Sequence, residues 1–410
     1  MKAGFFQVKT REQVWEAFQR FALLDAEEVS LDRALNRVLA HPVVASEDLP
    51  GFTRSTMDGY ALRSRDTFGA SESLPCLLEI VGEVAMGKQP AFELDTGKAA
   101  RIHTGGMLPA GADSVVMLEY TEELDERSVA VSRSVAPLEN VIRQGDDVRA
   151  GQEVLHSGRR LRAQEIGLLA GFGRERVTVR CRPKVAIISS GDEIVPVEQG
   201  LRPGELHDMN SYSLGAMVQD CGGEPAQLGV VPDHIPALRA KCEEALAWAD
   251  ICLISGGSSV GSRDLTLEVL TSLPDSDILV HGVAISPGKP TLLVKVGTRA
   301  FWGIPGQVAS AMVVFHVLVR PFTAYLSGAP PVLGQGWPLQ ARLSRNVASK
   351  QGREDFIRVN LREDNGVLVA EPMFGHSGLI STLVRATGLV RMERHVEGLY
   401  AGETVEVWTL

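Results

Sequence analysis

The chain has 410 residues, of which 44% are hydrophobic and 22% are charged, so it is long enough for about two to four domains and too apolar for a disordered chain. Its 41 basic and 51 acidic residues give a net charge of −10, and without a long basic block this composition argues against a nucleic-acid partner. The longest apolar stretch, 308–319, falls short of the ~20 residues that cross a bilayer. We therefore expect no membrane span and a cytoplasmic protein.

The first 45 residues have the pattern of two helices. The first begins at Thr10, where Gln13 completes a capping box, and Ser30 is positioned to cap the second. From 46 to 145, short apolar runs alternate with glycine and proline, which predicts a separate β insertion domain.

A helical pattern returns over 162–169 and ends at Gly171 and Gly173. We therefore expect residues 1–45 and 146–180 to form one discontinuous helical domain, which the β insertion interrupts.

Strands and helices alternate between 181 and 330. The apolar strand candidates are 185–189, 227–231, 251–254 and 300–304, and the helix candidates are 211–220, 235–248 and a long helix that ends near residue 325. Unbroken apolar strands separated by helices are typical of a parallel sheet that is covered on both faces. The pattern predicts a doubly wound α/β domain, followed by a C-terminal β domain over 331–410.

The five cysteines are scattered and odd in number, and no two of them form a CxxC pair: Cys76, Cys181, Cys221, Cys242 and Cys252. This spacing predicts neither a disulfide framework nor a zinc site. We interpret each cysteine as a small apolar residue, with a catalytic thiol as the alternative.

Three loops follow strands of the predicted sheet: SSGDE (189–193), SGGSSVGSRD (255–264) and GIPGQ (303–307). Ligands bind at such loops because free backbone N–H groups and helix N-termini gather there. The second loop matches neither GxGxxG nor a P-loop, but its glycines and hydroxyls suit a small-molecule pocket: Ser255, Gly256, Gly257, Ser258 and Ser259. The alternative is a tight turn after which Asp264 merely caps the next helix.

Other polar residues have competing structural interpretations. Asp233 stands where a helix cap belongs, whereas Asp58 and Thr104 lie beside glycines in predicted turns. Asp147 and Glu193 are loop carboxylates, and a carboxylate exposed on a loop commonly has no function.

Lys289 lies between a glycine and a proline in SPGKP (286–290), where it can offer a point charge to an anion. The alternative is an ordinary solvated lysine. Arg353 in GREDF and Ser377 in HSGLISTL are candidates for an anion clamp.

Several segments, in this order along the chain, resemble the MoeA family of molybdopterin molybdotransferases, which is also represented by the E domain of gephyrin. They are GFTRSTMDGYA (51–61), RIHTGGMLPAGADSVVMLE (101–119), IRQGDDV (142–148), SSGDEI (189–194), SGGSSVGSRD (255–264), SPGKP (286–290) and GIPG (303–306). The resemblance runs from the first predicted helix to the last strand.

The resemblance implies an enzyme of molybdenum cofactor biosynthesis. Such an enzyme inserts molybdate into the dithiolene of adenylylated molybdopterin, with release of AMP and the help of Mg²⁺. It also implies an elongated homodimer whose active site lies between the α/β domain of one subunit and the β insertion of the other. A MogA-like adenylyltransferase is a candidate partner protein.

The resemblance also assigns site residues. The family's catalytic residues fall on Asp58, Thr104, Asp147, Glu193, Asp233 and Asp264. Its substrate-binding residues fall on Ser255, Gly256, Gly257, Ser258, Ser259, Lys289, Pro305, Gly306, Arg353 and Ser377. Because molybdate and phosphate are anions, carboxylates beside them require a divalent ion or protons, so Glu193, Asp233 and Asp264 are the candidate magnesium ligands.

Two loops depart from the family pattern. Gln307 and Val308 stand where the family usually has Asn and Pro, and Ser258 stands within the usual GGVSVG. In the family, the loop that contains positions 307 and 308 contacts the ligand. The change at these positions therefore allows an alternative in which the protein is a tungstate-specific paralogue.

Two further functions remain open. One is that of a MogA-like adenylyltransferase, since 181–330 has that glycine-loop layout, although such an enzyme has no need of the β insertion. The second is that of a noncatalytic molybdopterin-binding scaffold or carrier, although a scaffold has no need of the acidic set.

Overall fold

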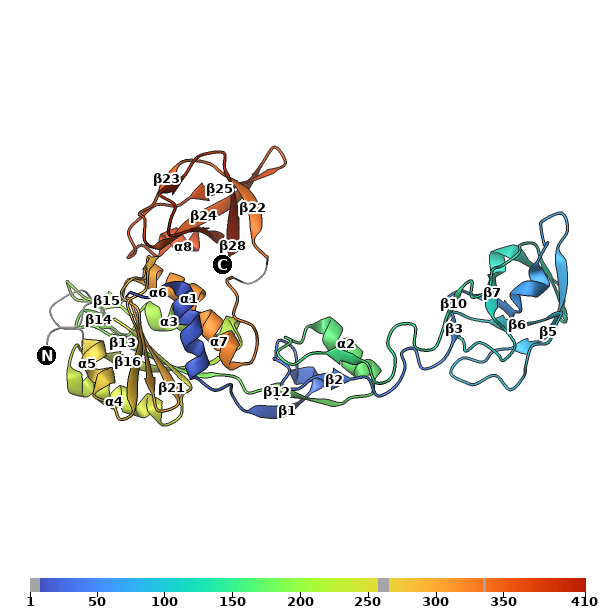
Figure 1. Ribbon diagram of the computed structural model, residues 1–410, viewed down its shortest axis with the longest axis horizontal. Coiled ribbons are helices and arrows are strands. Elements are labelled where there is room, and N and C mark those ends of the chain that lie inside the picture. The colour runs from blue at the N-terminus through green and yellow to red at the C-terminus, as the bar shows by residue number, and fades with distance from the viewer. Residues whose placement is uncertain (1–7, 257–264, 335–336) are drawn as a thin grey trace. The chain divides into compact units, whose positions relative to one another are not determined.

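The computed structural model describes residues 8–256, 265–334 and 337–410. The chain forms two compact units (Figure 1). The α/β unit comprises Met1–His41, Ser157–Arg162 and Arg176–Leu410, and the insertion unit comprises Pro42–His156 and Ala163–Glu175. The finer division into four domains stays a prediction.

The centre of the α/β unit is a six-stranded sheet. In spatial order its strands are β16 (Glu224–Val231), β13 (Lys184–Ser190), β17 (Ile251–Ser255), β21 (Arg299–Ile304), β20 (Leu292–Val296) and β18 (Ser276–His281). The first four are parallel, which confirms the predicted α/β class. β20 pairs antiparallel with both β21 and β18, because a short turn at Gly297 joins β20 directly to β21 without a crossover helix.

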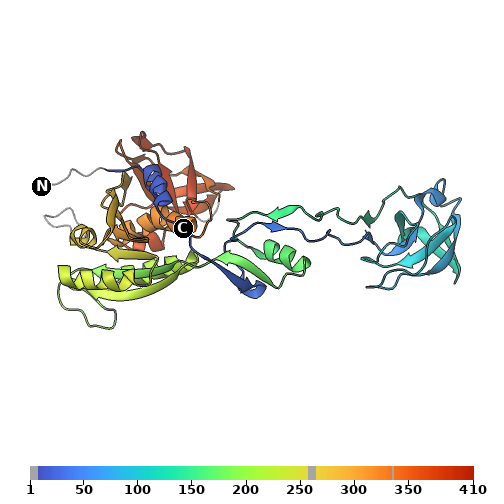
Figure 2. The same cartoon turned by 60° about the horizontal axis from the view of Figure 1, so that its bottom comes forward.

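Helices cover both faces of this sheet (Figures 1 and 2). They are α1 (Arg11–Glu16), α3 (Asn210–Asp220), α4 (Ile235–Leu246), α5 (Leu265–Thr271), α6 (Val308–Val314) and α7 (Arg320–Leu326). Residues of α4 and α5 share a core with Ala186 and Ile188 of β13. Residues of the other four helices share a separate core with Val185 and Ile187. Alternate residues of one strand therefore serve two cores.

The predicted long helix consists of α6, a π-helical segment η5 (Phe315–Val319) and α7. By length and composition Val308–Leu326 is apolar enough to cross a membrane, but 72% of its most apolar window is buried inside the protein. Phe322 packs edge to face against Phe18 and Trp302, with ring centroids 5.0 and 5.6 Å apart. This segment is therefore a core helix of the α/β unit.

The N-terminal segment confirms one predicted helix and contradicts the other. Thr10 and Gln13 form the predicted capping box at the start of α1. The second helix is wrong: Ala26–Ser30 is strand β1, which pairs antiparallel with β12 (Arg176–Arg180), and only the 3₁₀ turn η2 (Leu31–Arg33) follows. Ser30 makes no side-chain capping bond. Beyond η2, the backbone at residues 38–40 bonds to residues 159, 178 and 180, so pairing with distant segments overrides a weak local helical pattern.

The C-terminal residues form a second six-stranded sheet, as predicted. In spatial order its strands are β19 (Ile285–Ser286), β24 (Glu354–Asp364), β25 (Val367–Pro372), β22 (Leu339–Leu343), β28 (Thr404–Thr409) and β26 (Gly388–Met392). β19 comes from the chain between β18 and β20, so it joins this C-terminal sheet to the central sheet.

The insertion unit contains a third six-stranded sheet, in agreement with the predicted β structure. In spatial order its strands are β7 (Ser114–Met117), β4 (Gly59–Leu62), β6 (Lys98–Ile102), β5 (Cys76–Glu83), β9 (Ser128–Val131) and β8 (Thr121–Asp125). The unit also includes α2 (Ala163–Gly171), which confirms the helical pattern predicted over 162–169.

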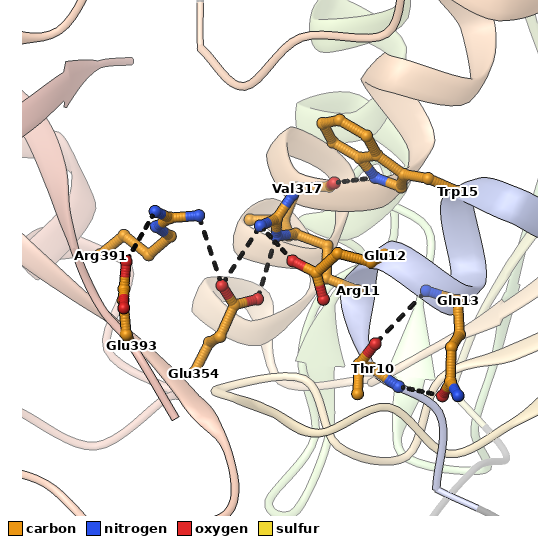
Figure 3. A network of polar contacts seen from close by, with 9 residues as sticks. All are labelled: Thr10, Arg11, Glu12, Gln13, Trp15, Val317, Glu354, Arg391 and Glu393. Carbon is orange, nitrogen blue, oxygen red and sulfur yellow. Dashed lines mark hydrogen bonds and ion pairs between the residues drawn. The ribbon is translucent and has the colours of Figure 1, made fainter. Parts of the chain in front are cut away.

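A buried ionic network joins α1 to the C-terminal sheet (Figure 3). Arg11 Nε lies 2.9 Å from Glu354 Oε2, and both residues are buried. Arg391 Nη1 lies 3.5 Å from Glu354 Oε1, and the Arg11 guanidinium lies 4.9 Å from the centre of the Trp15 ring. The buried Glu354 therefore bridges two guanidinium groups, each of which also pairs with an exposed carboxylate, Glu12 with Arg11 and Glu393 with Arg391.

Replacing Glu354 by Gln should strongly destabilise the protein. The change removes the buried counter-charge of Arg11 and leaves it only the exposed Glu12; breaking a buried pair typically costs about 3–5 kcal/mol of unfolding free energy. The matched control is Asp277→Asn, which breaks the exposed pair between Asp277 and Arg20 and should cost no more than about 1 kcal/mol. Denaturant unfolding measures both, and equal losses would contradict the role of the buried network.

A second prediction concerns His316 in η5. Burial, together with the smaller effect of the Arg320 charge, lowers the pKa of His316 from 6.5 to about 4. The folded state therefore favours the neutral imidazole. The stability that this residue contributes is complete above pH 6.5 and falls by roughly 3 kcal/mol as the pH decreases from 6.5 to about 4.

Unfolding measured across this pH range should show a shallower decline for His316→Gln than for the wild type, because the variant has no imidazole to protonate. The control is His41→Gln, at an exposed histidine. An unchanged pH dependence in His316→Gln would rule out this contribution.

Candidate active site

A cleft of about 720 Å³ opens at the carboxyl ends of β13, β17 and β21. Carboxyl ends of parallel strands meet at one edge of a sheet, and ligands bind there in α/β proteins. The predicted residues that line the cleft are Glu193, Asp233, Ser255, Gly256, Lys289, Pro305, Gly306, Arg353 and Ser377. Gly257, Ser258, Ser259 and Asp264 lie outside the described residues.

Asp233 is held at the cleft by two contacts. Ser190 Oγ donates to Asp233 Oδ1 at 2.7 Å, and Asp233 N donates to Asp192 Oδ1 at 3.0 Å. The alternative that Asp233 caps the following helix is wrong, because His234 is the N-cap residue of α4. The buried Ser190 instead orients the Asp233 carboxylate from the end of β13.

The buried carboxylate of Asp208 holds the end of β13 and the start of α3 together at the cleft. It accepts hydrogen bonds from Ser189 Oγ at 2.8 Å and from Ser211 N at 3.1 Å. Asp208 was not among the site residues predicted from the sequence. The available signal was its spacing, three residues before Ser211 at the start of a predicted helix, which is typical of a capping aspartate.

Asn210 is a second polar residue of the cleft that the sequence analysis missed. Its Nδ2 donates to Ser255 Oγ at 2.6 Å and to Gly306 O at 2.7 Å. The side chain therefore ties the loop after β17 to the loop after β21. No local pattern reveals this role, because both partners are distant in the sequence.

Gly256 is required by the close approach of two strand ends. Its φ is +106°, and a Cβ at this position would lie 2.0 Å from the carbonyl oxygen of Ser190. For this residue, the tight-turn interpretation is therefore supported by the structure. The turn also brings the backbone of β17 against the end of β13, where the cleft begins.

Gly256→Ala should destabilise the α/β unit by roughly 3 kcal/mol or more, because positive φ strain and steric overlap act together. Gly200→Ala is the matched control, since a Cβ at Gly200 meets no atom within 4 Å. Denaturant unfolding of both variants makes the comparison. If both substitutions have the same small effect, the close approach has no energetic importance.

Lys289 lies on a loop with a fixed backbone. Its carbonyl oxygen accepts hydrogen bonds from Val283 N and Thr291 N, both at 2.9 Å. The preceding Gly288 has a φ of +121°, and a Cβ there would lie 2.5 Å from a methyl carbon of Val314. The exposed ammonium group of Lys289 is therefore anchored by a rigid loop at the cleft.

Arg353 reaches the cleft from the C-terminal sheet. Its Nη2 donates to Asp355 Oδ2 at 3.3 Å, and its Nε lies 2.9 Å from Oδ1 in an ion pair whose N–H does not point at the oxygen. Asp355 is buried and also accepts from Ser349 Oγ at 2.6 Å. Asp355 therefore positions Arg353, a role that the sequence analysis did not assign.

Ser377 contacts the start of α6 through its backbone. Gln307 is the N-cap residue of α6, and its side chain makes no capping hydrogen bond. Instead, the carbonyl oxygen of Ser377 accepts from Ala309 N at 2.9 Å. The C-terminal loop thus accepts the hydrogen bond of a free N–H group in the first turn of α6. An asparagine at position 307 would be suited to accept that bond with its own side chain.

Besides the buried Asp208, whose carboxylate is bonded to Ser189 and Ser211, two carboxylates and two cations share the cleft. Glu193 and Asp233 line it together with Lys289 and Arg353. Among the described residues, no three His, Cys, Asp or Glu side chains are grouped so that they could hold a metal ion. Mg²⁺ is commonly bound by only one or two carboxylates, with water and substrate phosphates as its other ligands. Glu193 and Asp233 fit a magnesium ion of this kind.

The predicted residues of the insertion unit form a separate polar group. Thr104 N donates to Asp58 Oδ1 at 2.8 Å, and His103 Nδ1 lies 3.4 Å from the same oxygen. The hydrogen bond from Thr104 lowers the pKa of Asp58, and His103 lowers it further. Asp58 is therefore ionised and joined to a loop far along the chain, so it does more than shape its own turn.

Asp147 also belongs to the insertion unit. It is exposed, and its backbone N–H donates to Leu49 O at 3.1 Å. The structure thus joins Asp58 to Thr104 and gathers the cleft residues in the α/β unit, while Asp147 occupies a different turn.

Comparisons with known proteins identify the family of the chain. Three family models match the chain: the MoeA N-terminal region (domain I and II) over residues 9–173, a probable molybdopterin binding domain over 186–325, and the MoeA C-terminal region (domain IV) over 340–410. The fold and cleft thus define a protein with a molybdopterin-binding type of α/β domain. The chain belongs to the MoeA family.

Curated relatives and solved structures match most of the chain. A molybdopterin molybdenumtransferase from a Nostoc species is 38% identical over 84% of this chain and 79% of its own length. The enzyme of the same name from Haemophilus influenzae is 32% identical over 93% of each chain. A crystal structure of the MoeA protein from Pyrococcus horikoshii has a TM-score of 0.85 and 30% identity, and the match covers 98% of this chain and 100% of that one.

Proposed function

We propose that this chain is a molybdopterin molybdenumtransferase, which inserts molybdate into the dithiolene of adenylylated molybdopterin and releases AMP. The observation that carries the proposal is the cleft at the carboxyl ends of β13, β17 and β21. There the cations Lys289 and Arg353 and the carboxylates Glu193 and Asp233 line one space in a chain of the MoeA family. We also place the protein in the cytoplasm.

The cations of the cleft suit the charge of these substrates. Molybdate is a dianion and adenylylated molybdopterin carries phosphate, so each is attracted by a positioned positive charge. Lys289 offers a point charge from its rigid loop, whereas Arg353 offers a planar fork that matches an oxyanion. Because Asp355 holds Arg353, this fork is oriented before the substrate binds.

The carboxylates have a different task. Without a cation or a proton between them, Glu193 and Asp233 would repel both substrates. Bound there, Mg²⁺ would neutralise phosphate charge and activate a water molecule for cleavage of the adenylyl link. Ser190 keeps one Asp233 oxygen in place and leaves the other free for this role.

AMP release tests the proposed activity. Purified protein is mixed with adenylylated molybdopterin, molybdate and Mg²⁺, and AMP and active cofactor are measured. Asp233→Asn should lower the rate by roughly 100-fold or more, whereas Asp277→Asn, at an exposed residue outside the cleft lining, should leave it unchanged. No AMP release by the wild type would contradict the enzymatic proposal and favour a carrier.

The same purified protein distinguishes the proposed activity from those of an adenylyltransferase and a tungstate-specific paralogue. Formation of adenylylated molybdopterin from ATP and molybdopterin would favour the adenylyltransferase. A strong preference for tungstate over molybdate would identify the paralogue.

We also propose that the protein acts as a homodimer in which Asp58, Thr104 and Asp147 of one copy act with the cleft of the other. The proposal rests on the family resemblance and on the hydrogen-bonded, ionised state of Asp58.

Mixing two inactive variants, Asp58→Asn and Asp233→Asn, tests this proposal. If each site uses both copies, half of the mixed dimers are heterodimers with one intact site, and activity should return to about a quarter of the wild type. Sedimentation would verify the dimer. A dimer without any recovered activity would show that each site is built from one copy.

A further inference from the structure

A second cavity, of about 150 Å³, lies in the α/β unit and shares no lining residue with the cleft. Its wall includes residues 180–183, which lead directly into β13, whereas the cleft begins where β13 ends. A strand of seven residues separates these two ends by roughly 20 Å. The cavity is therefore independent of the candidate active site.

Arginine side chains dominate this cavity, which we call the arginine cavity. Its charged lining residues are Arg37, Arg160, Arg180, Arg182 and Asp220. The four arginines come from three separate segments of the chain, so the fold itself brings these like charges together. Like charges at short range repel each other, and such a cluster is costly unless an anion balances it.

Two of the arginines are anchored by protein contacts. Arg37 Nη2 bonds to Glu27 Oε1 and donates to Arg180 O at 2.7 Å. Arg180 Nη1 donates to Leu24 O at 2.9 Å. These contacts hold Arg37 and Arg180 in place and occupy some of their N–H donors.

The other two arginines keep their donors. Within the part of the chain that the structure describes, the guanidinium groups of Arg160 and Arg182 have neither a hydrogen bond nor an ion pair. Arg160 is partly buried, and its charge helps to lower the pKa of the neighbouring Arg320, after the larger effect of burial. The positive charge of Arg160 is therefore felt by its neighbours.

Negative groups near the cavity compensate only part of this charge. Asp220 lies 3.5 Å from Arg320, and Glu27 is paired with Arg37. The ends of α3 and α7 also lie at the cavity wall, and each contributes about half a negative charge. Asp25 and Asp250 also act on Cys181 in the cavity wall, but Asp250 is paired with Arg299. Arg160 and Arg182 therefore remain the cavity arginines whose guanidinium groups can still bind an anion.

We propose that the arginine cavity binds a phosphate group, either as inorganic phosphate or as a small phosphate monoester, with Arg160 and Arg182 as its ligands. Guanidinium groups bind tetrahedral oxyanions through paired N–H donors. The volume is about ten times the ~15 Å³ that one water molecule needs, which leaves room for a phosphate and a small substituent. Neutralising the cluster would also stabilise the folded state.

Phosphate titration tests this site in the full-length protein. The cleft offers cations of its own, so the measurement uses the Lys289→Gln/Arg353→Gln background, in which those two charges are removed. Inorganic phosphate is titrated by calorimetry at constant ionic strength with potassium chloride. We expect saturable binding of one phosphate per chain.

Adding Arg160→Gln and Arg182→Gln to this background should weaken phosphate binding at least tenfold. The matched control is Arg362→Gln, at an arginine on an exposed hairpin, which should change nothing. If the glutamine variants do not fold, Arg160→Lys/Arg182→Lys keeps the charge and loses the fork, and it should still weaken binding. Absence of saturable binding in the background, or equal affinity after the arginine changes, would overturn the proposal.

Glycerol 3-phosphate, titrated in the same way, distinguishes the two sources of the group. Tighter binding than that of inorganic phosphate indicates a monoester, and weaker binding indicates free phosphate. Both results depend on Arg160 and Arg182 if the proposal is correct. A failure of AMP release would not affect this outcome, because the titration involves no turnover.

Discussion

Parallel pairing of β13, β17 and β21 is the constraint on which the cleft depends. Ser189 of β13 is in register with Ser255 of β17, which is in register with Ile304 of β21. The three following loops therefore start at one level along the edge of the sheet. Gly256 allows two of these strand ends to touch, and Asn210 joins the second loop to the third. Backbone geometry thus determines the position of the cleft, and a few charged side chains line it.

The C-terminal sheet is attached to this edge in three ways. β19 pairs with β24, Arg11 forms a buried ion pair with Glu354, and the Ser377 carbonyl contacts the start of α6. Arg353 directly precedes Glu354 and is held by Asp355. Two buried carboxylates therefore directly follow the residue that offers a fork to an anion. One binds α1 and the other holds Arg353, so interactions that stabilise the fold also orient the side chain at the cleft.

Local patterns predicted what depends on neighbours in the chain. The Thr10 capping box, the apolar parallel strands and the long core helix were predictable because each depends on residues within a few positions. The segment 26–30 was not, since β12 pairs with it from far along the chain. Asp233 looked like a helix cap, although its partner Ser190 comes from another strand. The roles of Asn210 and Asp355 were not predicted for the same reason, because each role depends on side-chain contacts that the local sequence does not reveal.

The capping of α6 by Ser377 has a consequence for how the cleft can vary. This contact uses a main-chain oxygen, which every amino acid carries, so the side chain at position 377 is free to change without uncapping the helix. The same holds at position 307, whose capping function has passed to a different part of the chain. The side chains at two positions that line the cleft are therefore not needed to cap the helix, and they can differ while the architecture stays the same.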